Sequence, residues 1–564
     1  MTGRTGPRPT RAGVSLTLAL AGLLAGRATA QAAGPVPADT VIWGGPVYTA
    51  EAAHPTAQAV AVRAGRIVFV GDRDGARALV GPATRTIDLK GAALFPGFTD
   101  SHVHLDGVGE RELTLNLEGS RSAAEVAARV KARVATARPG ELIFGRGWIE
   151  TGWPEKRFLQ ASDIDAVAPD NPVILQRADG HAMTANTAAL RLAGITAATP
   201  APFGGAINKD PAGHLTGMLV DNAMALLEKV LPSETAEQRV KALKVGMAVE
   251  NRYGWTGVHF MSAPWGDVLA LEVLAAKGEA PLRVYAAVDR DDVDKLFASG
   301  PRTAGDGRVV TRAIKLYADG ALGSRGAALW APYSDDPPNT GLFRFKDEDT
   351  RAVLADAAAH GIQVCTHAIG DKANSRVLDL YAEALPKAGP DARWRIEHAQ
   401  IIRAVDIPRF ARLGVVASMQ PSHAIGDLHF AGARLGPDRL GDAYPWKSLR
   451  DAGAVIAGGS DAPVERGDPL IEFYGAVARK DLKGQSGPGW HPEQALSRDE
   501  ALRLFTSAAA YARFAERDLG TISLGKRADL TAFSVDLMTA PEAEIPKGHA
   551  VLTMVDGQVV WQAP

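Results

Sequence analysis

Four short apolar segments, each followed by a side chain that can bind a metal ion, constrain the fold of this chain more than any other feature. The first covers residues 94–104 and ends in two histidines one residue apart. Alternate side chains of a strand leave on the same face, so His102 and His104 point the same way. Two imidazoles at one strand end form half of a metal site that suits zinc and related ions. A His-x-His pair alone is a weak signal, since histidines also lie on solvated strands.

Three later segments repeat this pattern. Residues 362–371 contain His367, residues 394–400 contain His398, and residues 454–463 contain Asp461, each after a short apolar run. Between them and the first pair, residues 313–320 form an apolar strand that carries Lys315. A parallel (β/α)8 barrel gathers the carboxyl ends of distant strands into one mouth, where such enzymes have their active sites. The sequence therefore predicts a metal site at the mouth of a parallel α/β barrel.

In their residues and in their order along the chain, these motifs resemble those of the amidohydrolase superfamily, the metal-dependent hydrolases on a (β/α)8 barrel. They are similar in particular to its YtcJ-like branch, which includes N-substituted formamide deformylases. The matching stretches are residues 95–104, 315–325, 366–371, 395–400, 419–421 and 459–464. Together they span nearly the whole mature chain and are specific, although each alone is weak. The resemblance implies hydrolysis of a C–N bond, of amide, N-acyl or N-formyl type, in a small molecule.

The length of the chain and its strand and helix patterns predict further domains in addition to this barrel. The chain has 564 residues, more than one compact barrel requires. Short strands within residues 38–95 and 515–564 predict a composite β-sandwich built from both ends of the chain, as the resemblance also implies. Residues 96–514 alternate strands with Ala-rich helices, two of which open on the capping-box patterns at Ser122 and Ser497. Residues from about 110 to 250 are too many for one βα unit and predict an insertion over the active site.

Charge and cysteine content exclude several classes of function. A net charge of −2 gives no basis for binding nucleic acid or an acidic membrane surface. The single cysteine, Cys365, excludes an internal disulfide, and its place in an apolar strand predicts a buried, inert thiol.

The first 30 residues read as a signal peptide and not as part of the fold. Arginines precede a short apolar stretch and the small residues Ala28, Thr29 and Ala30, a pattern typical of a cleavage site. The apolar run is too short for a stable membrane span, so we expect no membrane insertion after cleavage. The mature chain is expected to be exported, and periplasmic if the source is a Gram-negative bacterium.

We assign His102, His104 and Asp461 to a first metal ion, and His367 with His398 to a second. Lys315 leaves two alternatives open. A protonated ammonium is a poor neighbour for divalent cations. The family resolves this conflict by carboxylating a barrel lysine, so that the resulting carbamate bridges two Zn²⁺ ions. If Lys315 is instead a salt-bridged lysine, the enzyme uses one metal ion.

The expected chemistry is attack of a metal-activated hydroxide on the substrate carbonyl. A metal ion lowers the pKa of its water from about 15.7 towards about 7. Asp461 would take the proton of that water and deliver it to the leaving nitrogen, which leaves poorly unless it is protonated. His398 or His367 would stabilise the oxyanion.

Candidate substrate contacts lie in the insertion and in the loop after the Lys315 strand. Ser324 and Arg325 follow a Gly-rich turn that lets a ligand approach closely, and His181 is either a substrate contact or part of the insertion's structure. His259, His423 and His429 are interpreted as structural or pocket-lining residues. Glu397 is interpreted either as a partner of the ligands or as a residue paired within the core, and in neither case as catalytic.

Two other functions stay open. The first is deamination of a cyclic amidine at one metal ion, which needs a further glutamate near His398 that the sequence does not place. The second is a non-catalytic exported binding protein, which the intact set of ligands disfavours. The sequence leaves the substrate amide, the native metal and the oligomeric state undetermined, a homodimer being one candidate assembly.

Overall fold

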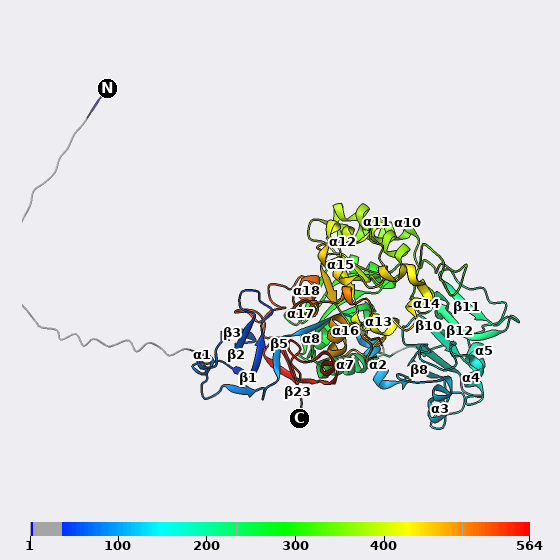
Figure 1. Cartoon of the computed structure of the whole chain (residues 1–564), viewed down its shortest axis with the longest axis horizontal. Coiled ribbons are helices and arrows are strands. Elements are labelled where there is room, and N and C mark those ends of the chain that lie inside the picture. The colour runs from blue at the N-terminus through cyan, green and yellow to red at the C-terminus, as the bar shows by residue number, and fades with distance from the viewer. Residues whose placement is uncertain (1, 4–35, 233–234, 485, 488) are drawn as a thin grey trace, which may run out of the picture. The chain divides into compact units, whose positions relative to one another are not determined.

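The structure, a computed structural model, describes residues 2–3, 36–232, 235–484, 486–487 and 489–564 (Figure 1). Residues 37–564 form one compact unit. Apart from residues 2 and 3, the predicted signal peptide lies outside the described residues and stays a prediction. Within the described part of the chain, no helix combines the length and the apolar character that a membrane span needs.

Eight parallel strands form the central barrel, as the sequence predicts. Backbone hydrogen bonds from His104 to Ala462 (2.8 Å) and from Asp461 to His102 (2.7 Å) connect the end of the last strand to the end of the first. A short antiparallel strand, β15 (Arg302–Ala304), adds to the fourth barrel strand. The barrel strands are β6 (Phe98–Val103), β13 (Trp255–Ala263), β14 (Arg283–Val288), β16 (Val309–Tyr317), β17 (Gln363–Ala368), β18 (Arg395–His398), β19 (Val416–Met419) and β20 (Ile456–Gly458).

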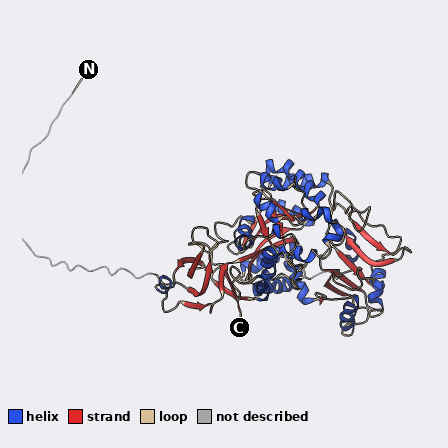
Figure 2. Cartoon of the chain, in the orientation of Figure 1, coloured by secondary structure: helices blue, strands red, loops and turns tan. Residues whose placement is uncertain are grey.

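Helices surround these strands and share one large apolar core with them (Figure 2). Ser497 forms the predicted capping box with Glu500, which satisfies two free N–H groups at the start of its helix. The larger helices between barrel strands and after them are α7 (Ala236–Tyr253), α8 (Trp265–Ala276), α9 (Val293–Ser299), α10 (Asp347–Ala359), α11 (Asp371–Ala388), α12 (Ile407–Leu413), α13 (Pro421–Asp427), α15 (Trp446–Asp451), α16 (Pro469–Ala478), α17 (Arg498–Leu504) and α18 (Ser507–Ala512).

An insertion separates the first two barrel strands, as predicted. It contains a six-stranded sheet and apolar clusters of its own. Ser122 caps its first long helix, α3 (Ala123–Val134), but the Glu125 carboxylate bonds to the Arg121 N–H and not to Ser122. The sheet consists of β7 (Leu115–Asn116), β8 (Ile143–Trp148), β9 (Val173–Arg177), β10 (Ala182–Ala185), β11 (Gly205–Lys209) and β12 (Leu215–Asp221), with helices α4 (Ala161–Asp165), α5 (Thr187–Leu192) and α6 (Ala225–Glu228) beside it.

Strands from both ends of the chain join in one eight-stranded sheet. Antiparallel pairing of β5 with β21 makes the connection, with Pro96 opposite Leu530 and Ala93 opposite Phe533. The two ends of the chain therefore do contribute strands to one sheet. The sandwich architecture and the exact domain limits stay predictions. The strands are β1 (Thr40–Tyr48), β2 (Thr56–Arg63), β3 (Arg66–Gly71), β4 (Arg85–Asp88), β5 (Ala93–Pro96), β21 (Leu530–Phe533), β22 (Ala550–Val555) and β23 (Gln558–Gln562).

Two glycines allow helix α2 (Leu105–Leu113), which follows the first barrel strand, to pack closely on α7. A Cβ on Gly109 would lie 1.9 Å from the carbonyl oxygen of Ala242, and one on Gly246 would lie 2.4 Å from that of Leu105. We therefore expect Gly109→Ala to force the helices apart and to lower the free energy of unfolding by about 1–3 kcal/mol. Chemical denaturation measures this loss. Gly441→Ala is the control, because a Cβ there meets nothing within 4 Å, and equal stability losses in both variants would contradict the packing argument.

Candidate metal centre

The predicted metal-binding side chains converge at the carboxyl ends of the barrel strands. His102 is the penultimate residue of β6, His367 lies in β17, His398 ends β18, and Asp461 follows β20. His398 and Asp461 have positive φ angles of 72° and 61°, in a region that residues other than glycine seldom adopt. Such backbone strain clusters at functional sites, and here it occurs where each strand turns into the barrel mouth.

His102, His104 and Asp461 lie close enough together to bind one ion. Their ligand atoms are within 4.8 Å of one another. The Nε2 atoms of His102 and His104 lie 3.4 Å and 3.3 Å from Asp461 Oδ1. Two imidazoles and one carboxylate are a donor set that zinc accepts, so the first predicted ligand group has a geometry that fits a divalent ion.

A buried ion pair beneath the site orients His102. Its Nδ1 lies 2.6 Å from Glu397 Oε2, and Glu397 in turn pairs with Arg395 at 2.7 Å. Because a carboxylate can only accept, Nδ1 carries the proton and the lone pair of Nε2 faces Asp461. Metal-binding histidines commonly have such a carboxylate partner. Glu397 therefore contacts a candidate metal ligand from a fully buried position, which fits a partner of the ligands.

His367 and His398 are neighbours, but among the described residues they do not share a group of three or more candidate ligand atoms. Their ring centroids are 4.6 Å apart. His367 Nε2 lies 3.4 Å from Asp319 Oδ1 and 3.4 Å from the carbonyl oxygen of Gly320. His398 instead joins a group with His423 and Asp461, whose ligand atoms also lie within 4.8 Å of one another.

His423, interpreted from the sequence as a structural or pocket-lining residue and not as a ligand, lies in this second group. Its Nε2 lies 3.5 Å from Asp461 Oδ2, and its Nδ1 lies 3.1 Å from Gln400 Nε2. An amide N–H can only donate, so Nδ1 accepts and the His423 proton sits on Nε2, facing Asp461. In this orientation His423 is a hydrogen-bond donor and not a metal ligand. Its position in α13, just after β19, is the sequence signal that could have identified it.

Lys315 lies within the same cluster, with only 1% of its surface exposed. Its Nζ is 3.2 Å from His102 Nε2. Among the described residues no carboxylate oxygen lies within 4.0 Å of this Nζ, so the alternative of a salt-bridged lysine has no partner there. Burial lowers the pKa of the Lys315 ammonium, which favours the neutral amine.

The electrostatics favour neutral histidines beside an ionised Asp461. Burial holds the pKa of His102 well below its usual value. Burial likewise lowers the pKa of His367 and His398. Although burial opposes ionisation of Asp461, a hydrogen bond from His104 helps to keep its pKa below the usual range. Neutral imidazoles and an anionic carboxylate are the protonation states that metal binding requires.

A cavity of about 70 Å³ opens beside this cluster. His181 reaches it from the insertion, and its Nδ1 lies 2.6 Å from Asp221 Oδ1. Three further carboxyl groups line the cavity, those of Asp179, Asp427 and Glu465, and burial raises the pKa of Asp427 to about 6 and that of Glu465 to about 7. The main lining residues are Ile149, Arg177, Asp179, His181, Leu322, His367, His398, His423, Asp427, Phe430, Asp461 and Glu465.

The loop after β16 contributes to this cavity through other residues than predicted. Ala321, Leu322 and Gly323 line it, whereas Ser324 and Arg325 do not. The Ser324 hydroxyl donates to the carbonyl oxygen of Ala321, and Arg325 pairs with Asp335 at 3.0 Å. The turn at Arg325, where φ is 61°, directs its side chain to that ion pair. Contact of these two residues with the substrate therefore gains no support from the geometry.

The remaining predicted residues lie as expected. Cys365 is buried, and burial raises the pKa of its thiol to about 12, so it is not a nucleophile at neutral pH. His259 contacts Arg395 at 2.8 Å below the site, and His429 lies 3.3 Å from Asp481.

Comparison with known proteins agrees with this geometry. The profile of the amidohydrolase family matches residues 85–561. The putative amidohydrolase YtcJ of Bacillus subtilis (strain 168) is 36% identical, over 92% of this chain and 99% of that protein. The N-substituted formamide deformylase of Arthrobacter pascens is 28% identical, over 93% and 98% of the two chains.

Among solved structures, that of an uncharacterised metal-dependent hydrolase from Pyrococcus horikoshii OT3 has a TM-score of 0.73 at 28% identity, and covers 89% of this chain and 99% of that one. The resemblance stated from the motifs is thereby confirmed. The chain belongs to the amidohydrolase family and is a metal-dependent hydrolase that acts on carbon–nitrogen bonds.

Proposed function

We propose that this enzyme hydrolyses small N-acyl amides, N-formyl amides in particular, with one or two bound divalent ions such as Zn²⁺. The observation that carries the proposal is the convergence of His102, His104 and Asp461 beside a small cavity at the barrel mouth. The relative from Arthrobacter pascens, an N-substituted formamide deformylase, supports the reaction type.

Each side chain has a role that follows from its position. When bound, a divalent ion lowers the pKa of water and polarises a carbonyl oxygen. Asp461, ionised and in contact with two histidines, accepts a proton from the attacking water and delivers it to the leaving nitrogen. The Nε2–H of His423 points towards Asp461 and the cavity, where it can donate a hydrogen bond to the developing oxyanion. His181, held by Asp221, lines the same cavity and would contact the substrate there.

The size of the cavity supports a short acyl group. Its volume of about 70 Å³ is small beside the roughly 300–1,000 Å³ of typical ligand pockets. Glu465, Arg177 and Phe430 are among the residues that line it. A formyl group leaves more of this space for the amine than a longer acyl chain does.

We further propose that Lys315 carries a carbamate that bridges two metal ions. Burial favours its neutral amine against the attraction of Glu397 and Asp461, neither of which forms an ion pair with it, and a neutral amine can attack carbon dioxide. The reaction forms the N–C bond and releases one proton, which leaves an anionic oxygen ligand. The negative charge would also balance the charge of two divalent ions.

A paired substrate experiment tests the proposed reaction. We expect the zinc-loaded mature chain to hydrolyse N-butylformamide about tenfold faster, in kcat/KM, than N-butylacetamide, because the extra methyl group does not fit the small cavity. Detection of released butylamine measures both rates. Removal of the metal with a chelator abolishes the reaction, and added Zn²⁺ restores it. Failure to release butylamine from either compound by the metal-loaded chain would refute the proposal.

One observation favours a second candidate, deamination of a cyclic amidine. This reaction needs an acid beside the metal site, and Glu465 lies in the cavity, 3.9 Å from His423, with its pKa raised by burial to about 7. Release of ammonia from a cyclic amidine such as adenine, with no cleavage of the formamide, would select this alternative.

A further inference from the structure

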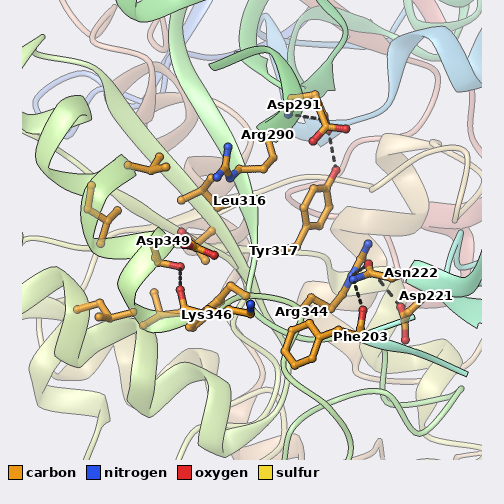
Figure 3. A pocket seen from close by; sticks show the side chains of 18 of the residues that line it. Phe203, Asp221, Asn222, Arg290, Asp291, Leu316, Tyr317, Arg344, Lys346 and Asp349 are labelled. Carbon is orange, nitrogen blue, oxygen red and sulfur yellow. Dashed lines mark hydrogen bonds and ion pairs between the residues drawn. The ribbon is translucent and has the colours of Figure 1, made fainter. Parts of the chain in front are cut away.

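A second and larger cavity opens at the same end of the barrel as the metal centre. Its volume is about 480 Å³, within the usual range of ligand pockets. It lies between the outer side of β16, the helices α10 and α11, and the end of the insertion sheet (Figure 3). It shares no lining residue with the cavity beside the metal centre.

The floor of this cavity is apolar. Leu316 and Leu380 reach it from β16 and α11, and Val353 and Leu354 from α10, and all except Val353 are at least 95% buried. Such a floor accepts an apolar group, since moving one out of water is favourable.

The mouth of the cavity carries charges of both signs that are not paired with each other. Arg290 and Lys346 supply positive charge, and Glu228, Asp291 and Asp349 supply negative charge. In the described part of the chain, none of these five side chains has an ion-pair partner within 4.0 Å. Figure 3 shows Arg290 and Asp291 across the cavity from Lys346 and Asp349. Each side of the cavity therefore carries one group of either sign, and because no two of these groups form an ion pair, both signs are available to a ligand.

From this arrangement we propose that the cavity binds a small zwitterion with an apolar body, of which an apolar α-amino acid is the simplest example. Its carboxylate would pair with Arg290 or Lys346, its ammonium with the facing carboxylates, and its side chain would cover the apolar floor. A ligand of one charge would pair with the groups of one sign only and would form fewer charge-assisted hydrogen bonds, so it should bind less tightly.

A short chain of contacts connects this site to the metal centre. Arg344 lines the larger cavity, donates to Asn222 Oδ1 at 3.0 Å and lies 4.0 Å from Asp221 Oδ1. The same carboxylate oxygen lies 2.6 Å from His181 Nδ1, and His181 lines the cavity at the metal centre. A ligand that attracts Arg344 therefore acts on the carboxylate that orients His181.

Isothermal titration calorimetry of the mature chain tests the site with three probes of similar shape. L-phenylalanine carries both charges, 3-phenylpropionate only the negative charge, and phenethylamine only the positive charge. We expect L-phenylalanine to bind, with a Kd at least about tenfold below that of either other probe. The measurement needs no turnover, so its outcome is independent of the proposed hydrolase reaction.

Two variants locate the binding. Arg290→Gln combined with Lys346→Gln should raise the Kd for L-phenylalanine about tenfold, and Ala225→Trp, at an exposed position on the cavity wall, should abolish binding by filling the space. Lys277→Gln and Ala276→Trp, both exposed on or just after α8, are the matched controls and should bind normally. No binding of L-phenylalanine, equal binding of a singly charged probe, or unchanged binding in the two site variants would each overturn the proposal.

Discussion

Replacing Asp461 by asparagine is expected to lower kcat/KM for amide hydrolysis by about 10⁴-fold, the upper range for loss of a general acid–base group. The carboxylate is within 3.5 Å of His102, His104 and His423, so one side chain serves both as candidate ligand and as proton carrier. Asparagine has the same size but cannot accept the proton. Steady-state kinetics on N-butylformamide measure the loss, and metal analysis shows whether the ion is lost as well.

Asp438→Asn is the matched control, because Asp438 is exposed and outside the cavity. It should retain full activity. Thermal melting of both variants separates a catalytic loss from an unfolded protein. If the Asp461 variant keeps more than about a tenth of the wild-type kcat/KM, Asp461 is not the general acid–base group.

The second large effect concerns Lys315. With zinc and bicarbonate present during expression, the mature chain is expected to contain two metal ions, and the Lys315→Ala variant one or none. Activity should fall with the metal, by about 10–100-fold, the range typical for loss of groups that support a metal site. Plasma emission spectrometry gives the metal content, and carbon-13 NMR after growth with labelled bicarbonate detects the carbamate directly.

Lys244→Ala is the control, since Lys244 is a surface lysine that pairs with Glu279. One metal ion in both the wild type and the Lys315 variant would eliminate the bridging role and favour the deaminase alternative. No bound metal in the wild-type chain would contradict the metal centre itself.

The sequence predicted those site residues that lie at strand ends. His102, His398 and Asp461 follow short apolar runs, and a parallel barrel necessarily brings such positions together. This argument needs no knowledge of side-chain contacts. The insertion was predicted from chain length alone, because the number of residues between the first two barrel strands exceeds that of one βα unit.

The residues that the sequence could not place depend on turns and on side-chain direction. His423 lies in a helix after β19, where strand alternation no longer applies. Arg325 belongs to the loop that was predicted after the Lys315 strand. It lies in a turn of positive φ, however, and its side chain pairs with Asp335. For His367, strand position alone does not reveal that Asp319 and Gly320 are its nearest polar neighbours.

The pairing of β5 with β21 has a consequence for biosynthesis. Ala93 is made early and Phe533 near the end, so the edge of β5 has no strand partner on that side until almost the whole chain has been made. An unpaired edge invites association with other chains, and contacts this distant in sequence form slowly. Shortening the chain by its last few dozen residues would therefore expose β5 permanently, and self-association, more than loss of catalysis, would be the first defect observed.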